Sequence, residues 1–149
     1  MNRSDRIFGI ARLEERKEHE AARALAVSRQ RLEEVEGRLA ELRRYRDEYR
    51  ERMRRDQRPD LTIADLKRHQ LFMRRLEDGI GQTESSAARA RDEWRVRETA
   101  WRHQRSRVEA LERVAERHQT NERRGRERRL ERANDDRASH ASSTRPDLR

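Results

Sequence analysis

The chain has 149 residues, of which 46% are charged and only 31% are hydrophobic, below the roughly 45–50% apolar share of an ordinary soluble domain. This composition excludes a conventional globular core and leaves disorder or long helices with narrow apolar seams, and the scarcity of Gly (5) and Pro (2) favours helices. The 39 basic and 30 acidic residues give a net charge of +9, which suits an acidic partner, and the absence of Cys excludes disulfides and thiolate metal sites.

A first helix is predicted over about residues 5–55, because apolar residues recur every seven positions. Its two seam positions are held by Leu25, Leu32, Leu39 and Met53, and by Ser28, Val35, Leu42 and Tyr49. Arg46 interrupts the first series. Upstream, Ile7, Ile10 and Leu13 drift in phase, so less regular packing is expected near the N-terminus.

A turn is predicted over 56–62, because Pro59 cannot continue a helix and disfavours helical backbone at Arg58. Thr62 and Asp65 then resemble a capping box, which places the start of a second helix near residue 63. We expect this helix to reach about residue 135 and to be followed by a disordered basic and polar tail over 136–149.

The second helix carries the stronger heptad signal. One seam position is held by Leu66, Met73, Ile80, Ala87, Trp94, Trp101, Val108 and Ala115, and the other by His69, Leu76, Thr83, Ala90, Arg97, Gln104, Leu111 and His118. The first series is apolar throughout. The second series is mixed, which predicts a seam of moderate stability.

A short connection between two long amphipathic helices favours an antiparallel hairpin. With Pro59 at the apex, facing residues should have numbers that sum to about 118. The seam residues of the first helix then face the seam residues of the second. Trp94 falls opposite Ala24, so Trp94 is interpreted as a seam anchor; an exposed contact for a partner is the alternative, more so for Trp101. The predicted fold is therefore an all-α monomer: a two-helix antiparallel coiled-coil hairpin over 1–135 with an overhanging C-terminal helix.

The sequence offers no catalytic constellation. The five His residues are scattered, and the segment Gly79–Gly81 lacks the Lys and the strand of a phosphate loop. We therefore expect a protein that is not an enzyme and that needs no cofactor or metal. The first residues lack the apolar stretch of a signal peptide and no run approaches a membrane span, so a soluble, cytoplasmic protein is expected.

Several segments together resemble the FliJ family of the flagellar type III export apparatus. They are LRRYRDEYRERM (42–53), HQLFMRRLEDGIGQ (69–82), Trp94, RVEALERVAERH (107–118) and NERRGRERRLERANDD (121–136). The resemblance covers about residues 7–136. It implies a stalk-like coiled coil that binds in the pore of the hexameric export ATPase, contacts the cytoplasmic domain of the membrane export gate and assists export chaperones, at the inner face of the cell membrane.

The resemblance also implies site residues. The family's gate-binding surface matches Phe72, Leu76, Gly79 and Thr83, although Gly79 and Thr83 replace the Ala and His expected there. For the ATPase ring, the candidates are arginines of the arginine-rich overhang of the second helix: Arg117, Arg123, Arg124, Arg126, Arg128 and Arg129. A solvated charged face is the alternative role for these arginines.

Two other functions stay open. One is the equivalent stalk of a virulence type III secretion system. The other is a generic coiled-coil scaffold or a nucleic-acid-binding protein, in which residues 117–132 would contact phosphates without sequence specificity.

Overall fold

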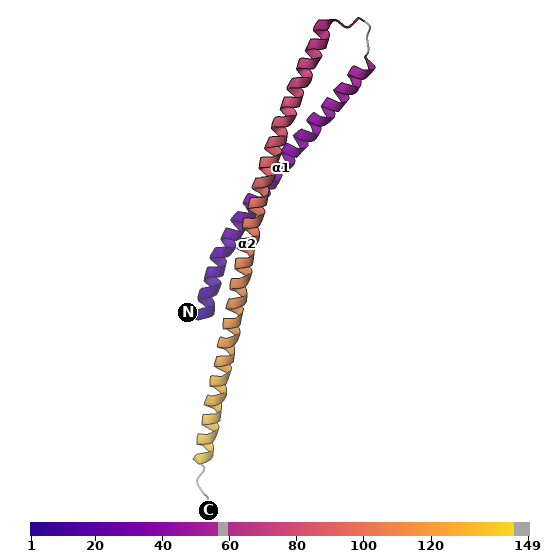
Figure 1. Cartoon of the computed structure of the whole chain (residues 1–149). Helices are drawn as coiled ribbons and strands as arrows, with labels where there is room; N and C mark the ends of the chain where they lie inside the picture. The colour runs from indigo at the N-terminus through magenta and orange to yellow at the C-terminus, as the bar shows by residue number, and fades with distance from the viewer. Residues whose placement is uncertain (57–59, 145–149) are drawn as a thin grey trace, which may run out of the picture. The chain divides into compact units, whose positions relative to one another are not determined.

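The structure is a computed structural model that describes residues 1–56 and 60–144. Two helices form the secondary structure of this part of the chain: α1, Arg3–Arg55, and α2, Ile63–Ser143 (Figure 1). The predicted all-α class and the antiparallel pairing of two long helices are confirmed. Pro59, the expected apex of the turn, lies outside the described residues.

Side-chain caps begin both helices, and the cap of α2 is reciprocal. At α2, the Thr62 backbone N–H donates to Asp65 Oδ2 (3.2 Å) and the Asp65 backbone N–H donates to Thr62 Oγ1 (3.2 Å). These bonds satisfy backbone donors that the first turn of a helix leaves free. At α1, the Asn2 backbone N–H donates to Asp5 Oδ2 (3.1 Å), so the helix starts at Arg3 rather than near residue 5.

The C-terminal end of α2 differs from the expectation. The helix continues to Ser143 rather than ending near residue 135, through residues that the sequence assigns to a disordered tail. Side-chain hydroxyls donate to backbone carbonyls three or four residues earlier in the last turns, so some of these carbonyls have a hydrogen-bond donor within the helix. The donors are Ser139, Ser142, Ser143 and Thr144. Residues 126–144 are all exposed, as an overhanging extension requires, and residues 145–149 lie outside the description.

The chain divides into two compact units, which we describe separately. The turn unit is His19–His103, and the terminal unit is Met1–Glu18 with Gln104–Arg149. Each contains a segment of α1 and a segment of α2.

The core of the turn unit lies on the predicted seam. Leu39 (8% exposed), Ile80 (2%) and Ala87 (3%) form a buried cluster. Val35, Leu42 and Leu76 are partly buried and pack against this cluster. Leu25, Leu32, Met73, Trp94 and Trp101 are half-buried at the other seam positions of the unit. The pairing of Trp94 with Ala24 stays a prediction.

One flank of the turn unit's seam carries a ladder of ion pairs between α1 and α2. Arg50 pairs with Glu77 (2.7 Å), Arg43 with Glu84 (3.2 Å) and Arg91 with Glu36 (3.1 Å). The partners ascend along α2 while they descend along α1, so the two helices run antiparallel. All six residues hold the heptad position next to the seam on the same side, and we call this side the ion-paired flank.

The terminal unit continues the same heptad register with smaller and more polar residues. Ala11 (4% exposed), Val108 (7%) and Ala115 (0%) are buried, and Leu111 is half-buried. Ile10, which the sum rule places opposite Val108, is 48% exposed instead. Ser4 and Ala11, which lie at whole heptads before Leu25, are buried in its place, so the heptad register holds to the N-terminus although Ile10 does not follow it.

Two buried polar groups complete the seam of the terminal unit. Gln104 Nε2 donates to both Glu14 Oε2 (2.6 Å) and the Glu14 carbonyl (2.9 Å), and Arg107 Nε lies 3.6 Å from the same carboxylate. Ser4 Oγ donates to Glu122 Oε2 (2.6 Å). Each cluster supplies donors to a carboxylate that the helix pair would otherwise isolate from water.

Candidate functional site

The four residues that match the gate-binding surface form one stripe along α2 of the turn unit. Phe72, Leu76, Gly79 and Thr83 follow one another at spacings of four, three and four residues, which keeps them on one side of a helix. Leu76 and Thr83 hold seam positions, whereas Phe72 and Gly79 hold the flanking position on the side away from the ion-paired flank. The stripe therefore runs along the edge of the seam.

Phe72 is held by two tyrosines of α1. Its ring lies 6.2 Å from that of Tyr45 in a T-shaped arrangement and 4.7 Å from that of Tyr49 in a tilted one. Phe72 nevertheless remains 38% exposed, and Tyr45 remains 45% exposed. The pair thus presents an aromatic surface whose geometry is fixed by packing before any partner arrives.

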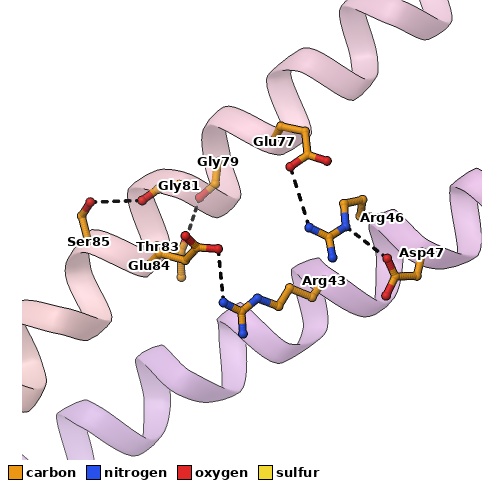
Figure 2. Close-up of polar contacts among 9 residues, drawn as sticks. All are labelled: Arg43, Arg46, Asp47, Glu77, Gly79, Gly81, Thr83, Glu84 and Ser85. Carbon is orange, nitrogen blue, oxygen red and sulfur yellow. Dashed lines mark hydrogen bonds and ion pairs between the residues drawn. The ribbon is translucent and has the colours of Figure 1, made fainter.

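Leu76 and Thr83 serve the helix pair as well as the stripe. Leu76 packs against the buried cluster of Leu39 and Ile80. Thr83 Oγ1 donates to the carbonyl of Gly79 (2.8 Å), and Ser85 Oγ donates to the carbonyl of Gly81 (3.1 Å), as Figure 2 shows. Hydroxyl bonds of this kind compete for carbonyls within the helix and accompany local bending.

Neither glycine of this segment is required by packing within the chain. A Cβ added at Gly79 or at Gly81 would meet nothing within 4 Å, and neither residue has a positive φ. Glycine costs a helix about 1 kcal/mol relative to alanine. The chain therefore tolerates a less stable helix at a point where its backbone is accessible from outside.

The flank that carries Phe72 has no ion pair between the helices beside Phe72 and Gly79 in the described residues, although Arg31 and Glu93 pair on this flank farther from the turn (3.5 Å). Figure 2 shows the Arg43–Glu84 and Arg46–Glu77 pairs that join the helices in this region. On the Phe72 side, a shallow cavity of about 450 Å³ is lined by Arg38, Glu41, Leu42, Arg44, Tyr45 and Glu48. Arg38 makes no ion pair within the described part of the chain. We call the set of Arg38, Tyr45, Phe72 and Gly79 the open flank.

The arginines proposed for the ATPase ring lie in the terminal unit. Arg117, Arg123, Arg124, Arg126, Arg128 and Arg129 are all exposed. Among residues 1–56 and 60–144, none of the six has an ion-pair partner; Arg129 Nε donates to the carbonyl of Gly125 (3.3 Å). Arg117 and Arg124 line one shallow cavity of about 480 Å³, and Arg123 and Arg126 line another of about 400 Å³. Their guanidinium groups remain available to an acidic surface.

Two features of the site did not follow from the sequence. Tyr45 and Tyr49 were not recognised as partners of Phe72, and the bond between Tyr49 Oη and His69 Nδ1 was not foreseen. The rule that facing numbers sum to about 118 pairs Tyr49 with His69 and Glu14 with Gln104. Applied to polar residues as well as apolar ones, it finds the Tyr49–His69 contact of this site and the Glu14–Gln104 contact of the terminal unit.

Residues 1–56 and 60–144 contain no group of three or more His, Cys, Asp or Glu residues that could hold a metal ion. No helix in the same part of the chain is both long enough and apolar enough to span a membrane.

Comparison with known proteins gives one match. The family model described as flagellar FliJ protein matches residues 4–147 of the chain. No curated protein and no solved structure matches it.

Proposed function

Because the chain belongs to the flagellar FliJ protein family, we propose that it links two parts of the flagellar type III export apparatus. In this proposal the terminal unit binds in the pore of the export ATPase hexamer, and the turn unit binds the cytoplasmic domain of the export gate. The protein acts as a monomer without catalysing a reaction, assists export chaperones and is held at the inner face of the membrane by the gate. The family description favours a flagellar system over a virulence system.

The open flank is the observation that supports gate binding. It combines a half-exposed aromatic pair, Phe72 and Tyr45, with a helix backbone that Gly79 leaves accessible. Interface contacts of high energy are typically aromatic side chains in well-packed surroundings. The tyrosines fix the ring of Phe72 in advance, so binding does not have to order it.

A binding measurement with the purified gate domain tests this role. Phe72→Ala should weaken binding by at least about tenfold, as expected for the loss of an aromatic interface residue. Leu71→Ala is the matched control, because Leu71 is 47% exposed but lies outside the stripe. Equal affinities for wild type and Phe72→Ala would exclude the open flank as the gate contact.

Gly79→Ala distinguishes close approach of a partner from simple helix softness. Because a Cβ at Gly79 meets nothing within the chain, this substitution should raise the melting temperature slightly. If the gate packs against the backbone here, the same variant should bind the gate less well while being more stable. Gly81→Ala supplies the comparison, since Gly81 lies off the stripe and should gain stability without losing affinity.

The unpaired arginines of the terminal unit support binding to the ATPase. Acidic ring surfaces would find exposed guanidinium groups that need not first release an internal partner. Adding the protein to the purified export ATPase should therefore raise its rate by promoting ring assembly. An ATPase rate that does not respond to the protein at any concentration would refute this role.

Charge reversal tests which arginines contribute. Arg124→Glu combined with Arg128→Glu should reduce the stimulation and make the remainder less sensitive to salt. Arg44→Glu combined with Arg52→Glu, in the turn unit, changes the net charge equally and should leave the stimulation intact. A loss of equal size in both variants would indicate a general effect of net charge.

A further inference from the structure

The seam residues of the turn unit are more exposed to solvent near the turn than in the middle of the unit. Leu39 and Ile80 are 8% and 2% exposed, whereas Leu66, two heptads before Ile80 at the same position, is 47% exposed. Ile63, at the start of α2, is 73% exposed. Apolar side chains therefore collect near the turn without the helix-to-helix burial that stabilises the rest of the unit.

This uncovered part of the seam forms a groove between the two helices. It has a volume of about 630 Å³ and is lined by Tyr49, Arg50, Met53, Leu66, His69, Gln70, Met73 and Arg74. Figure 1 shows α1 and α2 diverging toward the turn. We call it the turn groove.

The side chains at the seam explain the divergence. The middle of the unit has Ala87 and Ala90 at seam positions, and both are buried, so the backbones approach closely there. Toward the turn the facing seam residues are Tyr49 and His69, which hydrogen-bond to each other across the gap with ring centroids 6.0 Å apart. A pair of this size holds the helices apart.

We propose that the turn groove is a docking site for an amphipathic helix of another protein, with an apolar ridge flanked by acidic residues. The groove floor consists of Met53, Leu66 and Met73. Methionine side chains adapt to different partners because they are unbranched and polarisable. The span from Leu66 to Met73 is two helical turns, which accommodates anchors at i, i+3, i+4 and i+7.

Charge selects this occupant. Arg50 and Arg74 line the groove, and its described lining contains no carboxylate. Arg74 has no ion pair within the residues that the structure describes, and Arg50 shares Glu77 with Arg46. Acidic residues beside an apolar ridge would pair with Arg74 and would add to the Glu77 carboxylate that already pairs with Arg50.

A second copy of this chain fits the groove poorly. A symmetric dimer through the same surface would bring each arginine of the rim close to those of its partner, and like charges disfavour that contact. Most of the groove lies on the side of the seam that carries Arg50, opposite Phe72, although Tyr49 lines the groove and also contacts Phe72. The inference therefore goes beyond the proposed gate contact, and the two can fail independently.

The methionines supply a direct reporter. The chain has three; Met53 and Met73 line the groove, and Met1, which is 94% exposed, serves as the internal control. The full-length protein, labelled with ¹³C at the methionine methyls, is titrated with a synthetic helical peptide that has Leu at i, i+3, i+4 and i+7 and Glu on both sides of this ridge. The Met53 and Met73 signals should shift in a saturable manner while the Met1 signal stays in place.

Matched variants test the two parts of the recognition. Leu66→Asp should abolish the shifts, whereas Leu71→Asp should not, because both leucines are 47% exposed and only Leu66 lies in the groove. Arg74→Glu should weaken the Glu-flanked peptide about tenfold, as loss of a complementary charge does, while Arg68→Glu should not. Circular dichroism verifies that all four variants fold.

Three results would overturn the proposal. The first is that the Met53 and Met73 signals do not respond to the peptide. The second is that a peptide with Lys in place of Glu binds equally well. The third is a stable dimer in sedimentation that Leu66→Asp dissociates, since the occupant would then be a second copy. The affinity of Leu66→Asp for the gate domain, measured in parallel, shows whether loss of the turn groove also removes the proposed gate contact.

Discussion

Truncation of Ile80 tests whether the buried cluster holds the turn unit together. Ile80 is 2% exposed and belongs to the cluster with Leu39 and Ala87. Ile80→Ala removes three carbon atoms, which corresponds to about 2.4 kcal/mol of lost transfer free energy at roughly 0.8 kcal/mol each. A cavity adds to this cost, but a two-helix seam has open edges and can relax, so we expect about 3 kcal/mol in total.

Tryptophan fluorescence during urea unfolding measures this cost in the right part of the chain. Trp94 and Trp101 both belong to the turn unit, as Ile80 does. A loss of about 3 kcal/mol lowers the equilibrium constant for folding on the order of a hundredfold. Val96→Ala is the control, because Val96 is 65% exposed and should change the free energy of unfolding by no more than about 0.5 kcal/mol. If both substitutions shifted the midpoint equally, the assigned core would be wrong.

Further predictions concern the cap, the ion pairs and acid. Thr62→Ala should destabilise the turn unit by about 1 kcal/mol in the same urea assay; no change would mean that the cap is dispensable. Glu77→Gln should cost less than about 1 kcal/mol, and the difference should vanish in high salt. The pKa values of Glu14 and Glu122 are lowered, chiefly by hydrogen bonds from Gln104 and Ser4. A carboxyl with a lowered folded pKa stabilises at neutral pH and loses this effect as acid protonates it, so the protection factors of amides in the terminal unit, which correct for the pH dependence of intrinsic exchange, should fall below about pH 4.3; protection factors that stay constant there would contradict the assignment.

Heptad spacing was sufficient to predict the turn unit. Large and small apolar residues at fixed positions define which faces meet, and the connection of a few residues makes the helices antiparallel. Leu39 and Ile80 are accordingly buried, and Phe72, which is outside both seam series, is 38% exposed. Local periodicity carries this information because each helix buries a single stripe.

The terminal unit was less accessible to the same reasoning. Apolar residues were expected to mark the contact face, but Ile10 and Leu13 are 48% and 58% exposed while Glu14 is 6% exposed. The buried residue is polar and is satisfied by a partner ninety positions away, Gln104. A rule based on hydrophobicity misses a contact whose stability comes from mutual hydrogen bonding.

The turn groove and the end of α2 depended on information that a periodic pattern does not carry. Met53 and Leu66 hold seam positions in the sequence, and the opening of the seam there depends on the size of Tyr49 and His69, the next facing pair away from the turn. Likewise, the segment of α2 after residue 135 has a composition typical of disorder. The hydroxyls of Ser142 and Ser143 nevertheless donate hydrogen bonds to backbone carbonyls of the same segment.

The bond between Glu14 and Gln104 also opposes one misalignment of the two helices. Leucines and alanines repeated every seventh residue would accept a slip of a whole heptad with little penalty. A slip of seven residues toward the C-terminal end of α2 would carry the Glu14 carboxylate from Gln104 to Leu111, where it would be enclosed without a donor. One carboxylate and one amide therefore penalise a shift in this direction that the apolar residues alone would leave nearly unopposed.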